Sequence, residues 1–196
     1  MSLYDFSFGE MSAVINDGEQ MDNRGKNGKP GSTGFQPVPD GQLIKKRRLL
    51  PHWQMGGAAY FITFRTKSIN LSPGARKIVL EACVYLDDRK YHLWTAVAMP
   101  DHVHLLITPK KKADGQYFSL TEIVHSLKSF TGNRINNLLD RQGAAWQEDY
   151  FNRIVRDEAE FLEKWNYTRN NPVKKELCQR PEEWDAFYEY QGPRVW

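Results

Sequence analysis

The sequence is poor in cysteine and contains no long apolar run. Only two cysteines, Cys83 and Cys178, occur in 196 residues, too few and too far apart for a disulfide framework or a zinc knuckle. No apolar segment approaches the roughly 18 to 20 residues that a membrane span needs, and the amino terminus lacks the basic-then-apolar order of a secretory signal. We therefore expect a cytoplasmic protein without a membrane partner.

The sequence also lacks a strong net charge and a phosphate-binding loop. Its formal net charge is +3 and its pI is about 8.8, which permits nucleic acid as a partner without requiring it. No Gly-x-x-x-x-Gly-Lys segment occurs, so the sequence gives no indication of ATP binding. The position of the basic residues must therefore decide whether DNA is a partner.

The chain divides into three parts by composition. Residues 1–42 are rich in Gly, Asp, Asn, Ser and Pro without a sustained period, and we interpret them as a disordered extension or as translation from a wrongly assigned start codon. Residues 43–180 have the apolar periodicity of one folded domain. Residues 181–196 form an aromatic tail that could cover the core, lie on DNA or contact another subunit.

Within the domain, strand-like and helix-like segments alternate. The expected order is strand, helix, strand, strand, helix, strand and helix, over residues 58–66, 75–88, 91–98, 99–107, 119–141, 146–156 and 157–171. Ser72, Ser119 and Asp157 have the pattern of helix N-caps, and Pro172 is expected to end the last helix. This order predicts an α+β fold, a ferredoxin-like antiparallel sheet with helices packed on one face.

Two histidines stand at the start of the apolar segment that ends the predicted hairpin. His102 and His104 are two residues apart, so on a strand their side chains share a face at about 6.5 to 7 Å, while Val103 points into the core. Such a pair can bind one metal ion, although half-exposed histidines near a turn are also common without a ligand. A hard divalent cation would need oxygen ligands from elsewhere in the chain.

The last predicted helix carries a second candidate pair. Tyr167 and Asn171 are four residues apart and would lie one turn above the other on the same face. The phenol could act as a nucleophile and the amide oxygen as a metal ligand. A tyrosine on a helix more often packs, however, and an asparagine before proline commonly just ends a helix. Tyr150, on an extended segment, is the rival nucleophile.

Basic and aromatic residues offer a surface for a nucleic acid. Each basic residue could contact phosphate or simply be solvated. The candidates are Lys45, Lys46, Arg47 and Arg48 in one run, Lys128 and Arg134 on the second helix, and Arg153 and Arg156 beside the last strand. Trp146, Tyr150 and Phe151 could stack on unpaired bases, although we expect at least one of them in the core.

Four segments in this order resemble the single-tyrosine HUH transposases. They are Met99–Ile107 with His-Val-His, Ser126–Thr131, Trp146–Phe151 with Arg153 and Arg156, and Tyr167–Val173. The similarity is closest to the branch associated with repeated extragenic palindromes, the REP-associated tyrosine transposases related to the IS-two-hundred-like group. It covers about residues 45–180.

The resemblance implies a mechanism and a set of site residues. In such enzymes two histidines and a polar residue bind Mg²⁺ or Mn²⁺, and a tyrosine cleaves single-stranded DNA to leave a 5′-phosphotyrosine and a free 3′-hydroxyl. Carried over to this sequence, His102, His104 and Asn171 are the metal ligands and Tyr167 is the nucleophile, although related enzymes often have Gln at the position of Asn171.

The resemblance also implies a partner and leaves alternatives. The expected partner is single-stranded DNA with palindromic hairpins, bound by a nucleoid-associated monomer or homodimer. A domesticated hairpin-binding protein that no longer cuts, or a metal-dependent phosphodiesterase that uses water, remains as an alternative.

Overall fold

The computed structural model describes residues 43–46 and 52–192, all of which belong to one compact unit, Phe35–Trp196. The predicted extension 1–42, Arg47 and Arg48 of the basic run, and the last four residues of the tail lie outside the described residues. The described elements in chain order are β1 (Leu43–Lys46), β2 (His52–Met55), β3 (Tyr60–Arg65), α2 (Pro73–Leu86), β4 (Tyr91–Ala98), β5 (His102–Pro109), α3 (Leu120–Leu138), β6 (Phe151–Ile154), α4 (Glu158–Arg169), α5 (Asn171–Lys174), the 3₁₀ turn η1 (Pro181–Glu183) and β7 (Phe187–Glu189).

Five strands form one antiparallel sheet in the order β6-β3-β5-β4-β7. Helix α2 connects β3 to β4, and α3 connects β5 to β6, which gives two interleaved strand-helix-strand units in the order of a ferredoxin-like fold. The predicted fold class is therefore confirmed. Strands β1 and β2 form a separate antiparallel pair, in which Lys45 lies opposite Trp53 and Lys46 opposite His52.

The three long helices begin where the sequence predicts. The side chains of Ser72, Ser119 and Asp157 accept hydrogen bonds from the backbone N–H three residues later, which satisfies donors that a helix start leaves free. The second helix ends earlier than expected, at Leu138, and the side chain of this residue is half exposed.

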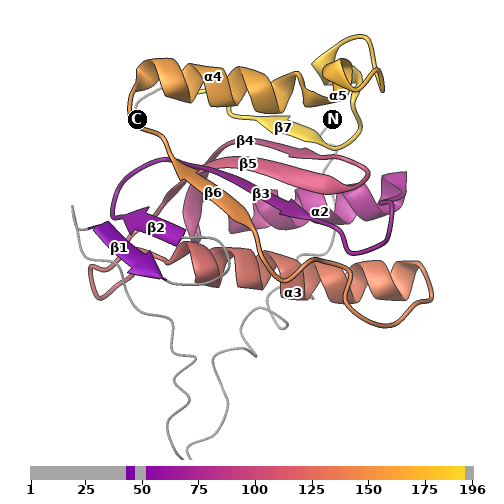
Figure 1. Ribbon diagram of the computed structural model, residues 1–196, viewed down its shortest axis with the longest axis horizontal. Coiled ribbons are helices and arrows are strands. Elements are labelled where there is room, and N and C mark those ends of the chain that lie inside the picture. Colours follow the sequence, from indigo (N-terminus) through magenta and orange to yellow (C-terminus); the bar gives the residue numbers. More distant parts are fainter. Residues whose placement is uncertain (1–42, 47–51, 193–196) are drawn as a thin grey trace, which may run out of the picture. The chain divides into compact units, whose positions relative to one another are not determined.

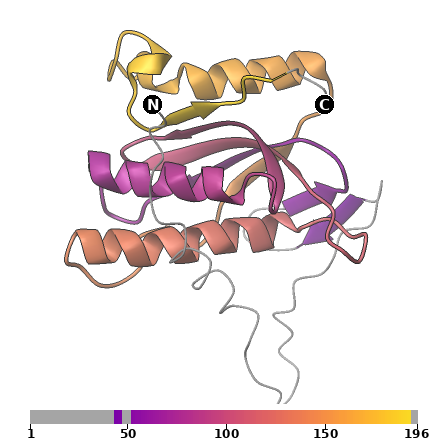
Figure 2. The same cartoon turned by 180° about the vertical axis from the view of Figure 1, so that it is seen from behind.

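The helices cover both faces of the sheet. Figures 1 and 2 show α2 and α3 on one side and α4 on the other, so the predicted placement on one face holds for the first two helices alone. The sequence of β5 explains the difference, because the strand is buried at seven of its eight positions and so needs a cover on each face.

Alternate residues of each strand face the two layers. On β3, Phe64 lies under α3, since its ring packs edge-on against Trp146, whose indole N–H donates to Thr131 of α3. Phe61, of opposite orientation, belongs to the core under α4. That core comprises Ala59, Phe61, Trp94, Leu106, Val155, Phe161 and Trp165. It anchors the helix that carries Tyr167.

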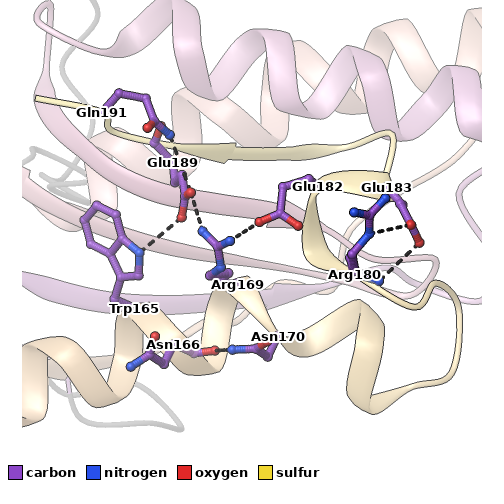
Figure 3. A network of polar contacts seen from close by, with 9 residues as sticks. All are labelled: Trp165, Asn166, Arg169, Asn170, Arg180, Glu182, Glu183, Glu189 and Gln191. Carbon is purple, nitrogen blue, oxygen red and sulfur yellow. Dashed lines mark hydrogen bonds and ion pairs between the residues drawn. The ribbon is translucent and has the colours of Figure 1, made fainter.

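The predicted aromatic tail packs against the sheet as far as the described residues reach. Strand β7 pairs with β4, and the Trp184 indole donates to the carbonyl of Ala98. Figure 3 shows Arg169 of α4 between the carboxylates of Glu189 and Glu182, with the Trp165 indole 3.3 Å from Glu189. This network joins α4 to η1 and β7, so covering the core is the role that the structure shows for residues 181–192.

Glu160 joins the start of α4 to β6. Its buried carboxylate accepts from the guanidinium groups of Arg153 and Arg156, the latter at 2.9 Å, and from the backbone N–H of Arg156 at 3.1 Å. Burial raises the pKa of Glu160, but these hydrogen bonds outweigh it and lower the pKa to about 2. The pair of arginines therefore holds the helix start in place through a charged carboxylate.

We expect Glu160→Gln to destabilise the fold by about 1 to 2 kcal/mol at pH 7, since charge-assisted hydrogen bonds are lost while solvent screens the exposed arginines. The folded-state pKa of Glu160, about 2, lies below the unfolded value of 4.5, so its stabilisation is complete above the unfolded pKa and disappears as the pH falls toward 2. Urea unfolding of parent and variant between pH 7 and pH 2 measures this difference. Glu163→Gln, at an exposed carboxylate of the same helix, is the control, and an equal loss in both variants would contradict the assignment.

Candidate active site

The two histidines lie side by side on the α4 face of β5. His102 is the first residue of the strand, and the ring centroids of His102 and His104 are 4.5 Å apart. Both side chains are buried. The predicted common face is therefore confirmed, and two imidazoles converge at one end of the sheet.

Each imidazole is held by a hydrogen bond on Nδ1. His102 Nδ1 lies 2.6 Å from a carboxylate oxygen of Asp101, and His104 Nδ1 lies 2.7 Å from the Thr63 hydroxyl. The second contact follows from the sheet register, in which Thr63 is directly opposite His104. Burial raises the pKa of Asp101, but its hydrogen bond to His102 and the nearby charges of His102 and Arg65 outweigh this and lower the pKa. Both rings can therefore direct Nε2 toward a common ligand.

His104 is neutral at physiological pH. Burial, with smaller contributions from the positive charges of His102 and Arg65, lowers its pKa to about 3. Its Nε2 is buried and has no hydrogen-bond partner among the described residues. A buried lone pair without a partner costs free energy unless a ligand or solvent meets it, so this nitrogen is suited to metal coordination.

Tyr167 of α4 lies over His104. The two ring centroids are 5.2 Å apart, and the Tyr167 ring also packs edge-on against Phe61 at 5.7 Å. Tyr167 is nevertheless 39% exposed, which leaves it accessible to a large substrate. The Lys174 ammonium lies 5.2 Å from the centroid of the same ring. The structure thus brings a phenol, a neutral imidazole and a cation together.

Asn171 does not continue the helix of Tyr167, so that part of the prediction was wrong. Helix α4 ends at Arg169, Asn170 caps it, and Asn171 begins α5. Pro172 has no N–H to donate to the Thr168 carbonyl, so the helical hydrogen bonds cannot continue through this position, and α4 ends two residues before the expected end at Asn171. The Asn171 side chain is buried, and its Oδ1 has no hydrogen-bond partner among the described residues.

These atoms fit a divalent cation by their chemistry. His104 Nε2 and Asn171 Oδ1 are buried acceptors without a hydrogen-bond partner in the described part of the chain, and His102 is fixed through Nδ1 with Nε2 at the other side of its ring. Imidazole nitrogens with an amide oxygen suit Mn²⁺ and, with bound waters, Mg²⁺. A second group, Asp87, Asp88 and His92, has potential ligand atoms within 4.8 Å of one another, but it lies at the other end of β4. Its Asp87 carboxylate already accepts from the backbone of Asp88 and Leu93, as expected for a turn.

The predicted DNA-contacting residues occupy different environments. Arg153 and Arg156 bind Glu160, yet their side chains are 47% and 70% exposed and can still face a phosphate. The Lys128 ammonium donates to the carbonyls of Gln147, Glu148 and Asp149, so all three of its N–H donors hold the loop before β6. A phosphate contact by Lys128 would require one of these bonds to break.

Arg134 lies half-buried on α3, on the face of the sheet opposite the histidines. Lys45 and Lys46 lie on β1. Among the aromatic candidates, Trp146 and Tyr150 are buried, whereas Phe151 is 48% exposed. Burial removes Tyr150 from reach of a DNA backbone and favours Tyr167 among the two tyrosines.

Three residues near the site were not predicted from the sequence. Asp101 could have been noticed, because a carboxylate directly before His102 is a common partner for a metal-binding imidazole. Thr63 depends on the register of β3 and β5, and Lys174 depends on the turn from α4 into α5; neither contact leaves a local sequence signal.

The matched family model is described as "Transposase IS200 like" and aligns with residues 65–171, more than half of the chain. The chain belongs to this family. A transposase and DNA-binding role follows, and the matched segment contains both histidines, Tyr167 and Asn171. No curated protein matches the sequence.

Several solved structures are similar to the IS200-like chain, among them the following two. A REP-associated tyrosine transposase bound to a REP hairpin is 15% identical, with a TM-score of 0.56 over 72% of this chain and 80% of that one. This similarity supports the α+β fold. A proposed transposase from Deinococcus radiodurans R1 is 19% identical, with a TM-score of 0.40 over 65% of this chain and 97% of that one.

We expect Thr63→Val to weaken Mn²⁺ binding by about 10- to 100-fold, because His104 loses the partner that fixes its ring proton on Nδ1. Thr63→Ser retains the hydroxyl and should bind like the parent. Isothermal titration with MnCl₂ measures the affinity without relying on cleavage. Thr95→Val, at a buried threonine that bonds to the Tyr188 carbonyl instead, is the control. Unchanged affinity in Thr63→Val would contradict the orienting role.

Proposed function

We propose that this chain is a metal-dependent endonuclease and strand transferase that cuts and rejoins hairpin-bearing single-stranded DNA through a 5′-phosphotyrosine at Tyr167. The observation that carries the proposal is the position of Tyr167 over a buried, neutral His104 whose Nε2 lacks a partner among the described residues. Membership of the IS200-like transposase family supports the same class of chemistry.

Cleavage is a transfer of the phosphoryl group from a DNA oxygen to the phenol. The Tyr167 oxygen forms a bond to phosphorus and loses its proton, while the bond from phosphorus to the 3′-oxygen breaks and that oxygen takes up a proton. The product remains a phosphodiester, so attack by a 3′-hydroxyl reverses the step, releases Tyr167 and joins two strands without ATP. The Lys174 ammonium beside the ring stabilises the negative charge of the phenolate and of the bound phosphate.

His102, His104 and Asn171 are the proposed ligands of Mg²⁺ or Mn²⁺, which when bound would act as a Lewis acid on the phosphate oxygens. Asp101 and Thr63 hold the two imidazoles through Nδ1 and leave Nε2 directed outward from these contacts. Burial keeps His104 from binding a proton at neutral pH, so its lone pair stays available.

The proposed DNA partner is a single strand that folds into a palindromic hairpin. The solved REP-associated transposase was bound to a REP hairpin, which supports this class of ligand. Exposed arginines beside β6 supply charge for backbone contacts. We propose that the protein acts in the cytoplasm on nucleoid DNA as a monomer or homodimer. Among the residues described, no helix is long and apolar enough to cross a membrane.

We expect the parent protein with Mn²⁺ or Mg²⁺ to form a covalent adduct with labelled single-stranded hairpins from DNA flanking its gene, visible on a denaturing gel. Tyr167→Phe should abolish the adduct, because it removes the only atom of the ring that can form the ester. Tyr150→Phe is the matched control, since Tyr150 is buried and should be dispensable for the chemistry.

Each other result selects an alternative. Cleavage that survives Tyr167→Phe without an adduct would indicate a phosphodiesterase that uses water. An adduct that persists in Tyr167→Phe but is lost in Tyr150→Phe would identify Tyr150 as the nucleophile. Hairpin binding without cleavage under any metal would indicate a domesticated binding protein.

We expect Lys174→Gln to slow adduct formation by about 10- to 100-fold while hairpin affinity changes little, because one exposed cation beside the phenol is removed. Lys175→Gln removes the same charge from the neighbouring position and serves as the control. Single-turnover rates with labelled hairpin measure the effect. Equal rates in the two variants would show that the position of Lys174 over Tyr167 contributes nothing specific.

A further inference from the structure

Phe151 is an exposed aromatic residue at the start of β6. Four large hydrophobic side chains among the described residues are exposed, and Phe151, at 48%, is one of the two aromatic members. The other is Tyr167. A single exposed hydrophobic side chain is ordinary in a folded protein, so any role of Phe151 has to be argued from its position relative to the site.

The sheet register places Phe151 on the same face as the histidines. Phe151 is directly opposite Thr63, and Thr63 is directly opposite His104. Directly opposed residues of antiparallel strands point to the same side of the sheet. Thr63 also contacts His104 through its hydroxyl, so the three side chains form one row across β6, β3 and β5. The row spans two strand spacings, roughly 10 Å.

Two arginines on the same face surround this row. Arg153 is two residues beyond Phe151 on β6, and Arg65 is two residues beyond Thr63 on β3. Because residues two apart on a strand point to the same face of the sheet, all four side chains lie on the face that carries the histidines. Their partners, Glu160 and Asp101, fix the guanidinium groups, while the side chains remain 47% and 57% exposed. A flat apolar ring between exposed cations is the arrangement that binds single-stranded nucleic acid, with bases on the ring and phosphates on the cations.

We propose that Phe151 is the stacking platform for an unpaired base next to the phosphate that Tyr167 attacks, with Arg65 and Arg153 binding the flanking phosphates. This inference rests on the proposed function, because it takes Tyr167 as the point of cleavage. The subsite accepts any base, since each has a π-face, and it acts by holding the strand extended across β3. Trp146 and Tyr150, buried in the fold, cannot serve in this way.

The test compares variants of Phe151 in a Tyr167→Phe background, in which cleavage does not interfere with binding. The probe is a fluorescein-labelled hairpin with a single-stranded tail, taken from DNA flanking the gene, and fluorescence anisotropy measures its affinity. Phe151→Ala should weaken binding about 5- to 150-fold, the equivalent of one lost base stack. Phe151→Leu, which retains an apolar side chain without a flat ring, should lose as much, and Phe151→Trp should bind at least as well as the parent.

A matched control and a second probe separate stacking from general damage. Leu138→Ala removes an equally exposed apolar side chain from α3 and should leave the affinity unchanged. A second set of probes carries a single abasic site at successive positions of the tail. At one of these positions the abasic site should weaken binding by the protein that has Phe151, and the same probe should bind the Phe151→Ala variant as well as the probe without an abasic site does. Unchanged hairpin affinity in Phe151→Ala, or full affinity in Phe151→Leu, would overturn the proposal. Unchanged affinity in Phe151→Ala is also the result expected if the ring contacts another protein and not DNA.

Failure of this subsite and failure of the proposed function give different results. If the protein with Tyr167 forms the covalent adduct but Phe151→Ala does not change the hairpin affinity, the stacking role of Phe151 alone is contradicted. If the parent protein forms no adduct, the proposed cleavage through Tyr167 is contradicted. The binding data for the Phe151 variants would still show whether a base stacks on Phe151.

Discussion

The antiparallel register between β3 and β5 is the constraint on which the site depends. It places Thr63 opposite His104 and Arg65 opposite His102. The register therefore decides the hydrogen-bond partner of His104, and it brings Arg65 to Asp101, the carboxylate that holds His102. A slip of one residue would turn the histidines toward α2 and α3 and bring apolar side chains under α4. Because both faces of β5 are covered, such a slip would bury polar rings without partners on one side and open the core on the other, which makes the register strongly specified.

Local chemistry was readable from the sequence, and long-range placement was not. The caps at Ser72, Ser119 and Asp157 depend on residues three positions apart, so a sequence pattern suffices to predict them. The common face of His102 and His104 follows equally from strand alternation. That α4 crosses to the opposite face of the sheet depends on the pairing of strands distant in sequence and on a core, including Trp94 and Phe161, that no single segment contains.

The environments of the predicted site residues escaped prediction for one physical reason. A sequence displays the charge of Lys128 but not the three carbonyls that occupy its ammonium group. It shows that Pro172 ends a helix, but not that a new short helix starts at Asn171. The burial that keeps His104 neutral is likewise a property of the assembled layers. In each case the residue type was evident, and the environment that determines its chemistry came from contacts far along the chain.

The α4 face of the sheet changes from apolar to polar along the strands, and this gradient locates the chemistry. On β5, Leu106 belongs to the core and His104 is buried and neutral. His102, the first residue of the strand, follows Asp101, whose carboxylate is exposed. On β3 the same direction leads from Phe61 in the core through half-buried Thr63 to exposed Arg65. At the boundary between the apolar and polar parts, the His104 imidazole is buried enough to remain unprotonated, while the Tyr167 phenol above it is still exposed to solvent. Further into the core, DNA could not reach the phenol; further out, water would hydrate the imidazole and weaken its preference for a ligand.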